Sequence, residues 1–284
     1  MKKNATLLLL PALILSGGVF LAPFVWLVLS SLKVRAPGSL MLQDGLTLAN
    51  YHRLLEDPFF ARVMLDTVVL SGVTTLACLV IALPVSRFIV RRAGRAKGLL
   101  LALTLVPLVS GALLPALGLI HLLGPLGIFN GILKAFGLIG SSLRLLGTKT
   151  GVIVGLVQSF LPLMILPLVN AMSRLPRDVE DAAASLGAPP ATVFRRVVLP
   201  LSVPGIVAGA VLVFCACLTS FVTPQILGQG KIATFGIIAY QQAALVLDWP
   251  FASTLAVAML AVLAVCLLVT TGLQSLVTRG RRAA

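Results

Sequence analysis

Few side chains in this sequence have the types and spacing that chemistry requires. The chain has four cysteines and two histidines. No two cysteines form a CxxC pair, so no familiar zinc spacing is present. All the cysteines lie in long apolar stretches, where they are expected to pack as small hydrophobic side chains. We therefore predict no catalytic residue and no metal site.

A phosphate-binding loop is also missing from the sequence. The segment Gly147-Thr148-Lys149-Thr150 comes nearest, but it lacks the glycine directly before the lysine. In a Walker A loop that glycine lets backbone N–H groups approach the phosphates. We expect no cofactor on this chain, and any ATP must be hydrolysed by another polypeptide.

The polar segment 173–201 has the strongest pattern in the chain. Asp178 is placed to cap a first short helix, and Gly187 suits the left-handed residue that ends it. Between them, positions i, i+3, i+4 and i+7 form one apolar stripe: Val179, Ala182, Ala183 and Leu186.

A second short helix is predicted directly afterwards. Pro190 can open it and Pro200 is expected to end it. Within it, Phe194 offers an aromatic anchor beside Arg195 and Arg196. Two such helices would make a docking surface for a cytoplasmic partner. The alternative is an amphipathic loop that only rests on lipid headgroups.

Long apolar stretches must position these features. The 284 residues are 59% hydrophobic and 11% charged, whereas globular chains carry about 25% charged residues. Each stretch has room for the roughly 20 residues that cross about 30 Å of hydrocarbon. We predict an all-α membrane protein, a single transmembrane domain over 1–284 with six spans at about 7–32, 65–90, 98–122, 149–172, 202–224 and 250–276. The first span is too long for a typical signal peptide, so we expect it to be retained.

The charge distribution predicts the orientation. The net charge is +14, and cytoplasmic loops of membrane proteins carry an excess of Lys and Arg. With the N-terminus inside, the cytoplasmic side holds Lys2, Lys3, Arg87, Arg91, Arg92, Arg95, Lys97, Arg174, Arg177, Arg195, Arg196, Arg279, Arg281 and Arg282, which makes fourteen. The outer side holds eight: Lys33, Arg35, Arg53, Arg62, Lys134, Arg144, Lys149 and Lys231. We predict N-in and C-in, with 124–147 outside, either interfacial with a short helix near 130–136 or re-entrant. The basic loops are short and almost free of aromatic residues, so nucleic acid is not an expected partner.

The segment 173–201 resembles the EAA motif of ABC-importer permease subunits. That motif reads EAA, three residues, Gly, nine residues, Ile, any residue, Leu-Pro. Here Asp181-Ala182-Ala183 stands at EAA, Gly187 follows after three residues, and Val197 precedes Leu199-Pro200 at the matching distance. The departures are Asp for Glu and Val for Ile, and the spacing is intact.

Further segments resemble the spermidine/putrescine branch of these permeases. They are Thr47-Leu48-Ala49-Asn50-Tyr51, Gly127-Ile128-Phe129-Asn130, Leu161-Pro162-Leu163-Met164, Phe221-Val222-Thr223-Pro224 with Leu227-Gly228, and Asp248-Trp249-Pro250-Phe251. The resemblance therefore covers nearly the whole chain, and it is more specific for the permease class than for the solute.

The resemblance implies the type I ABC importer permease (MetI-like) fold in the bacterial inner membrane, in a transport subunit that is not an enzyme. It implies import of a small solute, foremost a polyamine, by alternating access. The implied partners are the lipid bilayer, cytoplasmic ATPase subunits that hold ATP and Mg, a periplasmic substrate-binding protein and a second permease, in a heterodimer rather than a homodimer. The motif implies that six residues couple this chain to the ATPase: Asp181, Ala182, Ala183, Gly187, Leu199 and Pro200. We add Phe194 to this set as the aromatic anchor.

The substrate path is less strongly marked. Asp66 and Asp248 are the acidic groups at the outer edges of spans, and acidic groups on a membrane path are functional by default. Gln158 and Gln225 are further polar candidates. The alternative for both carboxylates is an interfacial charge at a helix end.

Two other interpretations stay open. The same permease class serves other solutes, including aminoethylphosphonate, thiosulfate, iron, molybdate and opine-like molecules. An ion-coupled secondary transporter would instead need ionisable residues at mid-bilayer, and no predicted span has one near its middle.

Overall fold

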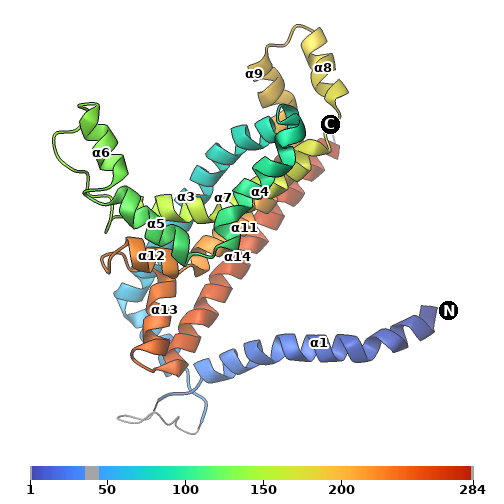
Figure 1. Cartoon of the computed structure of the whole chain (residues 1–284). Helices are drawn as coiled ribbons and strands as arrows, with labels where there is room; N and C mark the ends of the chain where they lie inside the picture. Colours follow the sequence, from blue (N-terminus) through green and yellow to red (C-terminus); the bar gives the residue numbers. More distant parts are fainter. Residues whose placement is uncertain (1, 36–44, 283–284) are drawn as a thin grey trace. The chain divides into compact units, whose positions relative to one another are not determined.

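The structure is a computed structural model that describes residues 2–35 and 45–282, with side chains described over 15–35 and 45–270. Across these residues the regular structure is helical, and no strand is present (Figure 1). The α-helices are α1 Lys2–Ser31, α2 Ala49–Glu56, α3 Pro58–Arg91, α4 Lys97–Val109, α5 Leu113–Leu123, α6 Ile128–Ala135, α7 Lys149–Ser173, α8 Arg177–Ser185, α9 Pro190–Val193, α10 Leu199–Leu201, α11 Val203–Thr219, α12 Val222–Leu227, α13 Phe235–Ala244 and α14 Trp249–Arg282. A 3-10 turn, η1 Gly94–Ala96, precedes α4, and a π-helix, η2 Phe194–Val198, follows α9.

Several of these helices are suited to a membrane. Among the described residues, four are long and apolar enough to cross one, or five if the bent pair Pro190–Leu201 and Val203–Thr219 counts as a span. The part of α1 with described side chains, Leu15–Ser31, is a shorter apolar helix. The chain is therefore a multi-pass membrane protein, while the number six and the N-in/C-in orientation stay predictions.

The third predicted span, 98–122, is divided in the structure. α4 ends at Val109 and α5 begins at Leu113, with Gly111 between them at φ +74°. Pro107 inside α4 lacks the N–H of a regular turn, and a left-handed glycine is a common helix end. The apolar stretch that reaches spanning length here is Leu113–Ala135, which combines α5 and α6.

The described chain forms two compact units. One comprises Met1–Arg62 and Ile238–Ala264, and the other comprises Val63–Ile237 and Val265–Ala284. In the second unit α7 is the central helix, because α4, α5, α11 and α12 all pack against it. Its side chains Leu156, Met164 and Leu168 are fully buried in the core of that unit. The single transmembrane domain over 1–284 stays a prediction.

The most extensive contact in this core is between α7 and α11. Gly205 and Gly209 lie four residues apart on one face of α11. A Cβ atom at Gly209 would lie 3.2 Å from the Met164 Cα, and one at Gly205 would lie 2.7 Å from the Pro167 carbonyl oxygen. Small residues at this spacing let two membrane helices approach with their backbones in contact.

Candidate functional site

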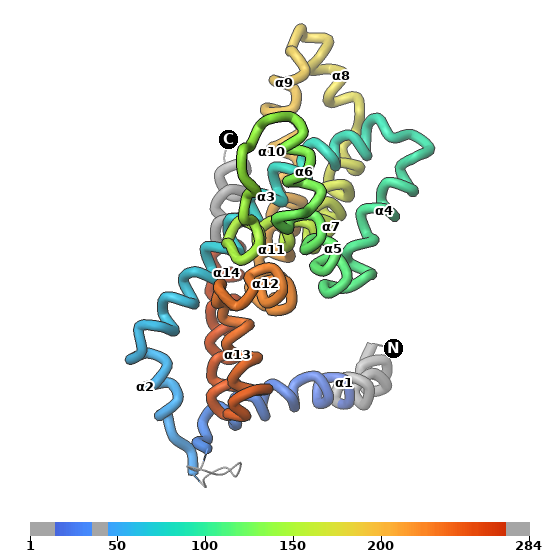
Figure 2. Tube along the Cα trace, turned by 60° about the vertical axis from the view of Figure 1, so that its left-hand side comes forward, coloured from blue at the N-terminus to red at the C-terminus, as the bar shows by residue number. Residues whose placement is uncertain are grey.

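The predicted docking segment forms a pair of short helices. α8 and α9 lie next to each other in both views, joined by a turn (Figure 1 and Figure 2). No residue of α8 is buried. Pro176 occupies the N-cap position and makes no side-chain cap, so the prediction that Asp178 caps the helix is wrong. Asp178 lies in the first turn, where a carboxylate is favourable beside the helix N-terminus.

The turn between the two helices depends on Gly187. Its φ is +81°, the left-handed conformation that a residue with a Cβ adopts at a cost. The Gly187 N–H donates to Ala184 O at 2.9 Å, and the Ala188 N–H donates to Ala183 O at 3.2 Å. These two bonds are those of a Schellman motif, so the predicted left-handed helix end is confirmed.

The second half of the segment is less regular than predicted. α9 begins at Pro190, as expected. The chain then continues through η2 and α10 before it bends by 67° into α11. Pro200 lies in α10, directly after η2, and the helix ends one residue later at Leu201, close to the predicted end. The bend follows at Ser202.

The residues predicted to couple to an ATPase differ in exposure. Asp181, Ala182 and Gly187 are exposed, and the apolar Leu186 beside them has 89% of its surface exposed. Three others, Ala183, Leu199 and Pro200, are half-buried. The exposed face of α8 is therefore open to a partner. The coupling role of the whole set stays a prediction.

The Phe194 ring contacts other side chains of this chain and is not fully exposed. It is half-buried and packs against the core of the second unit. The Arg87 Cζ lies 5.0 Å from the centre of its ring, which is cation–π distance. The prediction that a partner uses this ring is untested.

Glu180 on α8 is held by two arginines of α3. Its Oε1 accepts from Arg91 Nε at 2.8 Å, and Arg91 Nη2 lies 2.6 Å from the same oxygen. Arg87 Nη2 is 3.8 Å from the other carboxylate oxygen. The Glu180 and Arg91 side chains are only 16% and 19% exposed. Arg91 also donates to Leu175 O at 3.1 Å, so α3, α8 and the chain before α8 meet at one charged cluster.

The predicted path residues of the second unit have different surroundings. Asp66 pairs with Lys149 at 2.7 Å, with both side chains about half exposed (51% and 58%). Gln158 lies in α7, and its buried Oε1 has no hydrogen-bond partner among the described residues. Gln225 lies in α12 and is exposed.

A comparison with known protein families decides what the chain is. A model of the binding-protein-dependent transport system inner membrane component matches residues 4–283. The chain belongs to this family. The predicted resemblance to ABC-importer permeases is thereby confirmed.

Curated relatives and a solved structure agree with this assignment. The permease is 34% identical over 223 residues to the spermidine/putrescine transport system permease protein PotB of Escherichia coli (strain K12), a match that covers 78% of this chain and 81% of the relative. It is 32% identical over 243 residues to PotB of Haemophilus influenzae, with 86% and 85% covered. A bacterial alginate ABC transporter, crystallised in complex with alginate pentasaccharide-bound periplasmic protein, matches with a TM-score of 0.77 at 17% identity, over 98% of this chain and 97% of the other. That last match shows that the fold is the one found in ABC importers.

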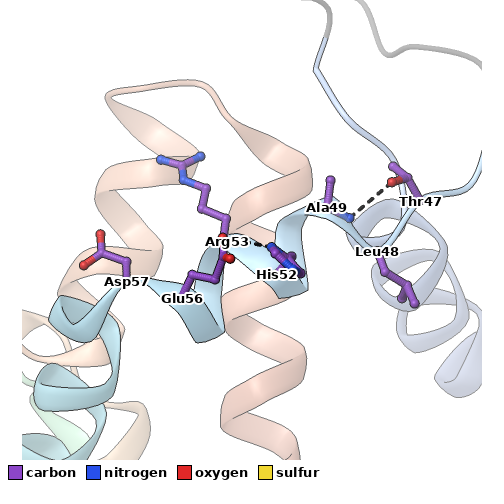
Figure 3. Close-up of a pocket in the computed structure, with 7 residues that line it drawn as sticks. All are labelled: Thr47, Leu48, Ala49, His52, Arg53, Glu56 and Asp57. Carbon is purple, nitrogen blue, oxygen red and sulfur yellow. Dashed lines mark hydrogen bonds and ion pairs between the residues drawn. The ribbon is translucent and has the colours of Figure 1, made fainter.

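A shallow cavity lies along α2 in the first unit of the permease (Figure 3). His52 Nδ1 and Glu56 Oε2 are 2.8 Å apart on adjacent turns, and both side chains are largely exposed. Thr47 accepts from the Ala49 N–H at 3.1 Å and shapes the turn before the helix. This surface has charged side chains of both signs at its rim and no buried reactive group among its lining residues.

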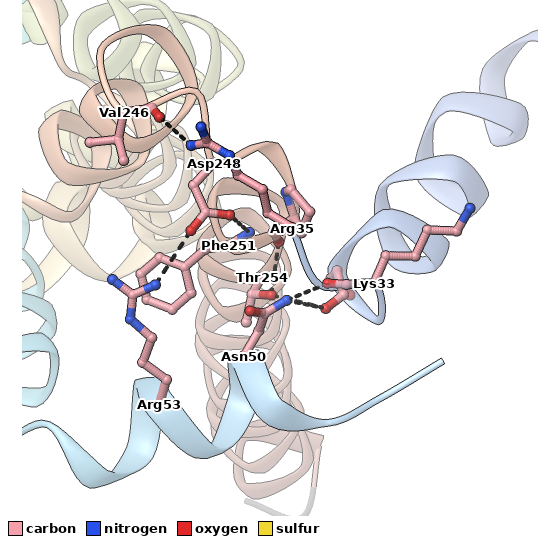
Figure 4. Close-up of polar contacts among 10 residues, drawn as sticks. Lys33, Arg35, Asn50, Arg53, Val246, Asp248, Phe251 and Thr254 are labelled. Atoms are coloured by element: carbon pink, nitrogen blue, oxygen red, sulfur yellow. Dashed lines mark hydrogen bonds and ion pairs between the residues drawn. The ribbon is translucent and has the colours of Figure 1, made fainter. Parts of the chain in front are cut away.

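Asp248, the fourth predicted path residue, has structural partners in the first unit (Figure 4). Its Oδ1 accepts from the Phe251 N–H at 3.2 Å, and its Oδ2 lies 3.4 Å from Arg53 Nη1. Arg53 also lies over the Phe251 ring, 4.0 Å from its centre. The carboxylate therefore caps the start of α14, which was the alternative considered for it, and its role on a substrate path stays a prediction.

The residues that sequence reasoning missed are Glu180, Arg87 and Arg91. A signal was present in the sequence. Arg87 and Arg91 are four residues apart, and two like charges at that spacing destabilise a helix unless an anion lies between them. The acidic residues available on the same predicted side are Asp178, Glu180 and Asp181, so the sequence narrowed the counter-ion to one of these three.

Proposed function

We propose that this chain is the membrane-spanning subunit of an ATP-driven importer that moves a polyamine or a related small solute from the periplasm to the cytoplasm. The observation that carries the proposal is the geometry of α8. An exposed face with Asp181, Ala182 and Leu186 stands beside a glycine turn at the spacing of the EAA motif. Such a face suits insertion into a partner, because small side chains allow close backbone approach.

The proposed partners follow from the sequence and from the family. The sequence has no Walker A motif, so a cytoplasmic ATPase would hold ATP and Mg, and this chain would need no cofactor. A periplasmic binding protein would deliver the solute, by analogy with the alginate transporter and its solute-bound periplasmic protein. We favour pairing with a second, different permease in the inner membrane over a homodimer, because the polyamine systems are the resembling branch.

In the proposed cycle, ATP binding closes the ATPase dimer and moves the coupling helices. That movement rotates the membrane helices and opens the path outward, and hydrolysis resets it. The two sites are then linked by a coupling free energy. A change in α8 should lower transport per ATP with little effect on the choice of solute.

The polyamine assignment rests on the function for which the relatives are named, with PotB as the leading case. One polar group in the described apolar helices bears on how the solute would be recognised. Gln158 is the polar group in α7 with an unpaired buried oxygen, so this chain would offer a neutral contact to the solute. The positive charge of a polyamine would then be recognised chiefly by the binding protein and the partner permease.

The decisive experiment is ATP hydrolysis by the complex reconstituted in liposomes with its ATPase and its binding protein. Spermidine, putrescine, aminoethylphosphonate, thiosulfate and an iron chelate would be tested separately. We expect stimulation by spermidine or putrescine. Stimulation by another compound would keep the importer and replace the solute. Solute uptake driven by an ion gradient without ATP would overturn the importer itself in favour of a secondary transporter.

A further inference from the structure

We propose that Glu180, Arg91 and Arg87 form a clamp that transmits movement of the coupling helix α8 to the membrane helix α3. The inference rests on the proposed ATPase coupling and adds the route by which the movement leaves the coupling helix. Glu180 is a positioning residue in this scheme, since it acts through α3 and touches no solute.

The packing of α8 makes such a clamp necessary. None of its residues is buried, so apolar contact holds the helix only weakly. Its best-covered charged side chain is Glu180, at 16% exposure. The Glu180 carboxylate joins α8 to Arg91 and Arg87 of α3, 89 and 93 residues earlier in the chain. A force on α8 therefore reaches α3 through these charged contacts.

The geometry is that of a rigid connection. Arg91 directs two N–H groups to one carboxylate oxygen and uses Nη2 also for Leu175 O. A planar guanidinium with several bonds has a fixed orientation, which a lysine ammonium would not have. Because the pair is partly buried, salt screens its electrostatic attraction less than it screens that of a surface pair.

Phe194 extends the clamp to the second half of the coupling segment. Arg87 contacts the Glu180 carboxylate at 3.8 Å and the Phe194 ring at 5.0 Å. α8 and η2 are thus connected to the same turn of α3. Both halves of the segment would move α3 together, and relative slippage between them would be resisted.

Three further charged groups line the cavity around the clamp, and none of them is paired with a clamp residue among the described residues. Arg92 and Arg177 line the same cavity and add positive charge, and Asp181 is the second carboxylate there. No ion pair joins Asp181 to an arginine among the described residues. Neutralising Glu180 would therefore remove the carboxylate that pairs with Arg87 and Arg91, and Asp181 would be the one carboxylate left in the lining of this cavity.

The test uses the complete complex of permease, ATPase and binding protein in liposomes. Glu180→Gln keeps the size of the side chain and removes its charge. We expect ATPase subunits to co-purify as in the wild type, while solute moved per ATP hydrolysed falls by about 5-fold or more. Arg91→Lys should lie between the two. Asp178→Asn is the matched control, since Asp178 lies on the same helix, is exposed and has no ion pair in the described structure.

A charge exchange separates transmission from simple loss of structure. Glu180→Arg combined with Arg91→Glu should recover most of the transport per ATP that either single reversal loses. Full coupling in Glu180→Gln would overturn the clamp. A double variant that transports no more solute per ATP than the single variants would overturn it as well. If Glu180→Gln fails to accumulate, the double variant alone decides. A wild-type complex without ATP-driven transport would instead refute the proposed function, so the two failures are distinguishable.

Discussion

At the scale of single residues, two polar positions that carry the family resemblance, Asn50 and Asn130, hold backbone groups in place. Asn50 Nδ2 donates to the carbonyl oxygens of Ser31 and Lys33 at 3.1 and 2.7 Å. The Thr254 hydroxyl donates to the same Ser31 carbonyl at 3.2 Å. Backbone groups at the end of a membrane helix lack helical partners, and burying them unpaired is costly. These side chains supply the missing donors.

Asn130 offers a direct test of this role. It is 1% exposed, and its amide makes three bonds that close the segment after α5. Nδ2 donates to Gly124 O and Leu143 O at 2.9 and 3.0 Å, and Oδ1 accepts from the Leu143 N–H at 2.8 Å. Asn130→Ala leaves these backbone groups unpaired, so we expect the midpoint of thermal unfolding in detergent to fall by roughly 5 °C or more. Asn170→Ala, at an exposed position of α7, should change it little. Equal shifts in both variants would contradict the assignment.

The left-handed turn at Gly187 leads to a second prediction at this scale. No atom lies within 4 Å of a Cβ built there, so any cost of substitution comes from the backbone alone. Asn tolerates this conformation and Val does not. Gly187→Val should therefore reduce co-purification with the ATPase or uncouple it, while Gly187→Asn should stay near wild type. ATP-driven uptake measured in vesicles checks this, and wild-type uptake by the Val variant would remove Gly187 from the coupling set.

At the scale of elements, the packing of α11 on α7 depends on the absence of side chains. Gly209 lies where a Cβ would meet Met164 Sδ at 2.7 Å and Met164 O at 3.2 Å. Gly118 in α5 has nothing within 4 Å of its Cβ position. We expect Gly209→Ala to lower the free energy of unfolding by about 1–3 kcal/mol through overpacking. Gly118→Ala should raise it slightly, since alanine favours helix. Thermal unfolding of both variants in the same detergent measures the sign, and a stabilised Gly209→Ala would contradict the close contact.

The sequence predicted the ends of the short helices better than it predicted breaks within spans or contacts between helices. The left-handed end at Gly187 and the start at Pro190 follow from local conformational preferences, which a sequence displays directly. The break at Gly111 was missed, because hydropathy summed over a window is insensitive to the φ of one residue. The Glu180–Arg91 pair was missed for another reason, since it joins positions 89 residues apart. The spacing of Arg87 and Arg91 indicates that an anion is needed, but only the fold shows which carboxylate supplies it.

At the scale of the whole molecule, orientation rests on the distribution of basic residues. The predicted inner loops and the two termini together hold fourteen of the 22 Lys and Arg residues. An even number of crossings returns the chain to the side where it began, and an odd number does not. The described helices that suit a membrane number four, or five with the bent pair, so the location of the C-terminus is a direct test of the parity of the span count.

Two reporter fusions test the orientation. A reporter that is active only in the cytoplasm, fused after Ala284, should be active, because six crossings keep both ends inside. The same reporter inserted after Gly140, in the segment predicted to lie outside, should be inactive, and a reporter active only in the periplasm should give the opposite pair of results. Periplasmic activity after Ala284 would imply an odd number of crossings. It would also place the basic C-terminal tail on the outer side, although positive charge is usually retained in the cytoplasm. Cytoplasmic activity at both positions would indicate that the segment between α5 and α7 does not reach the outer side, and the third span would then have to be redrawn from α4 and α5.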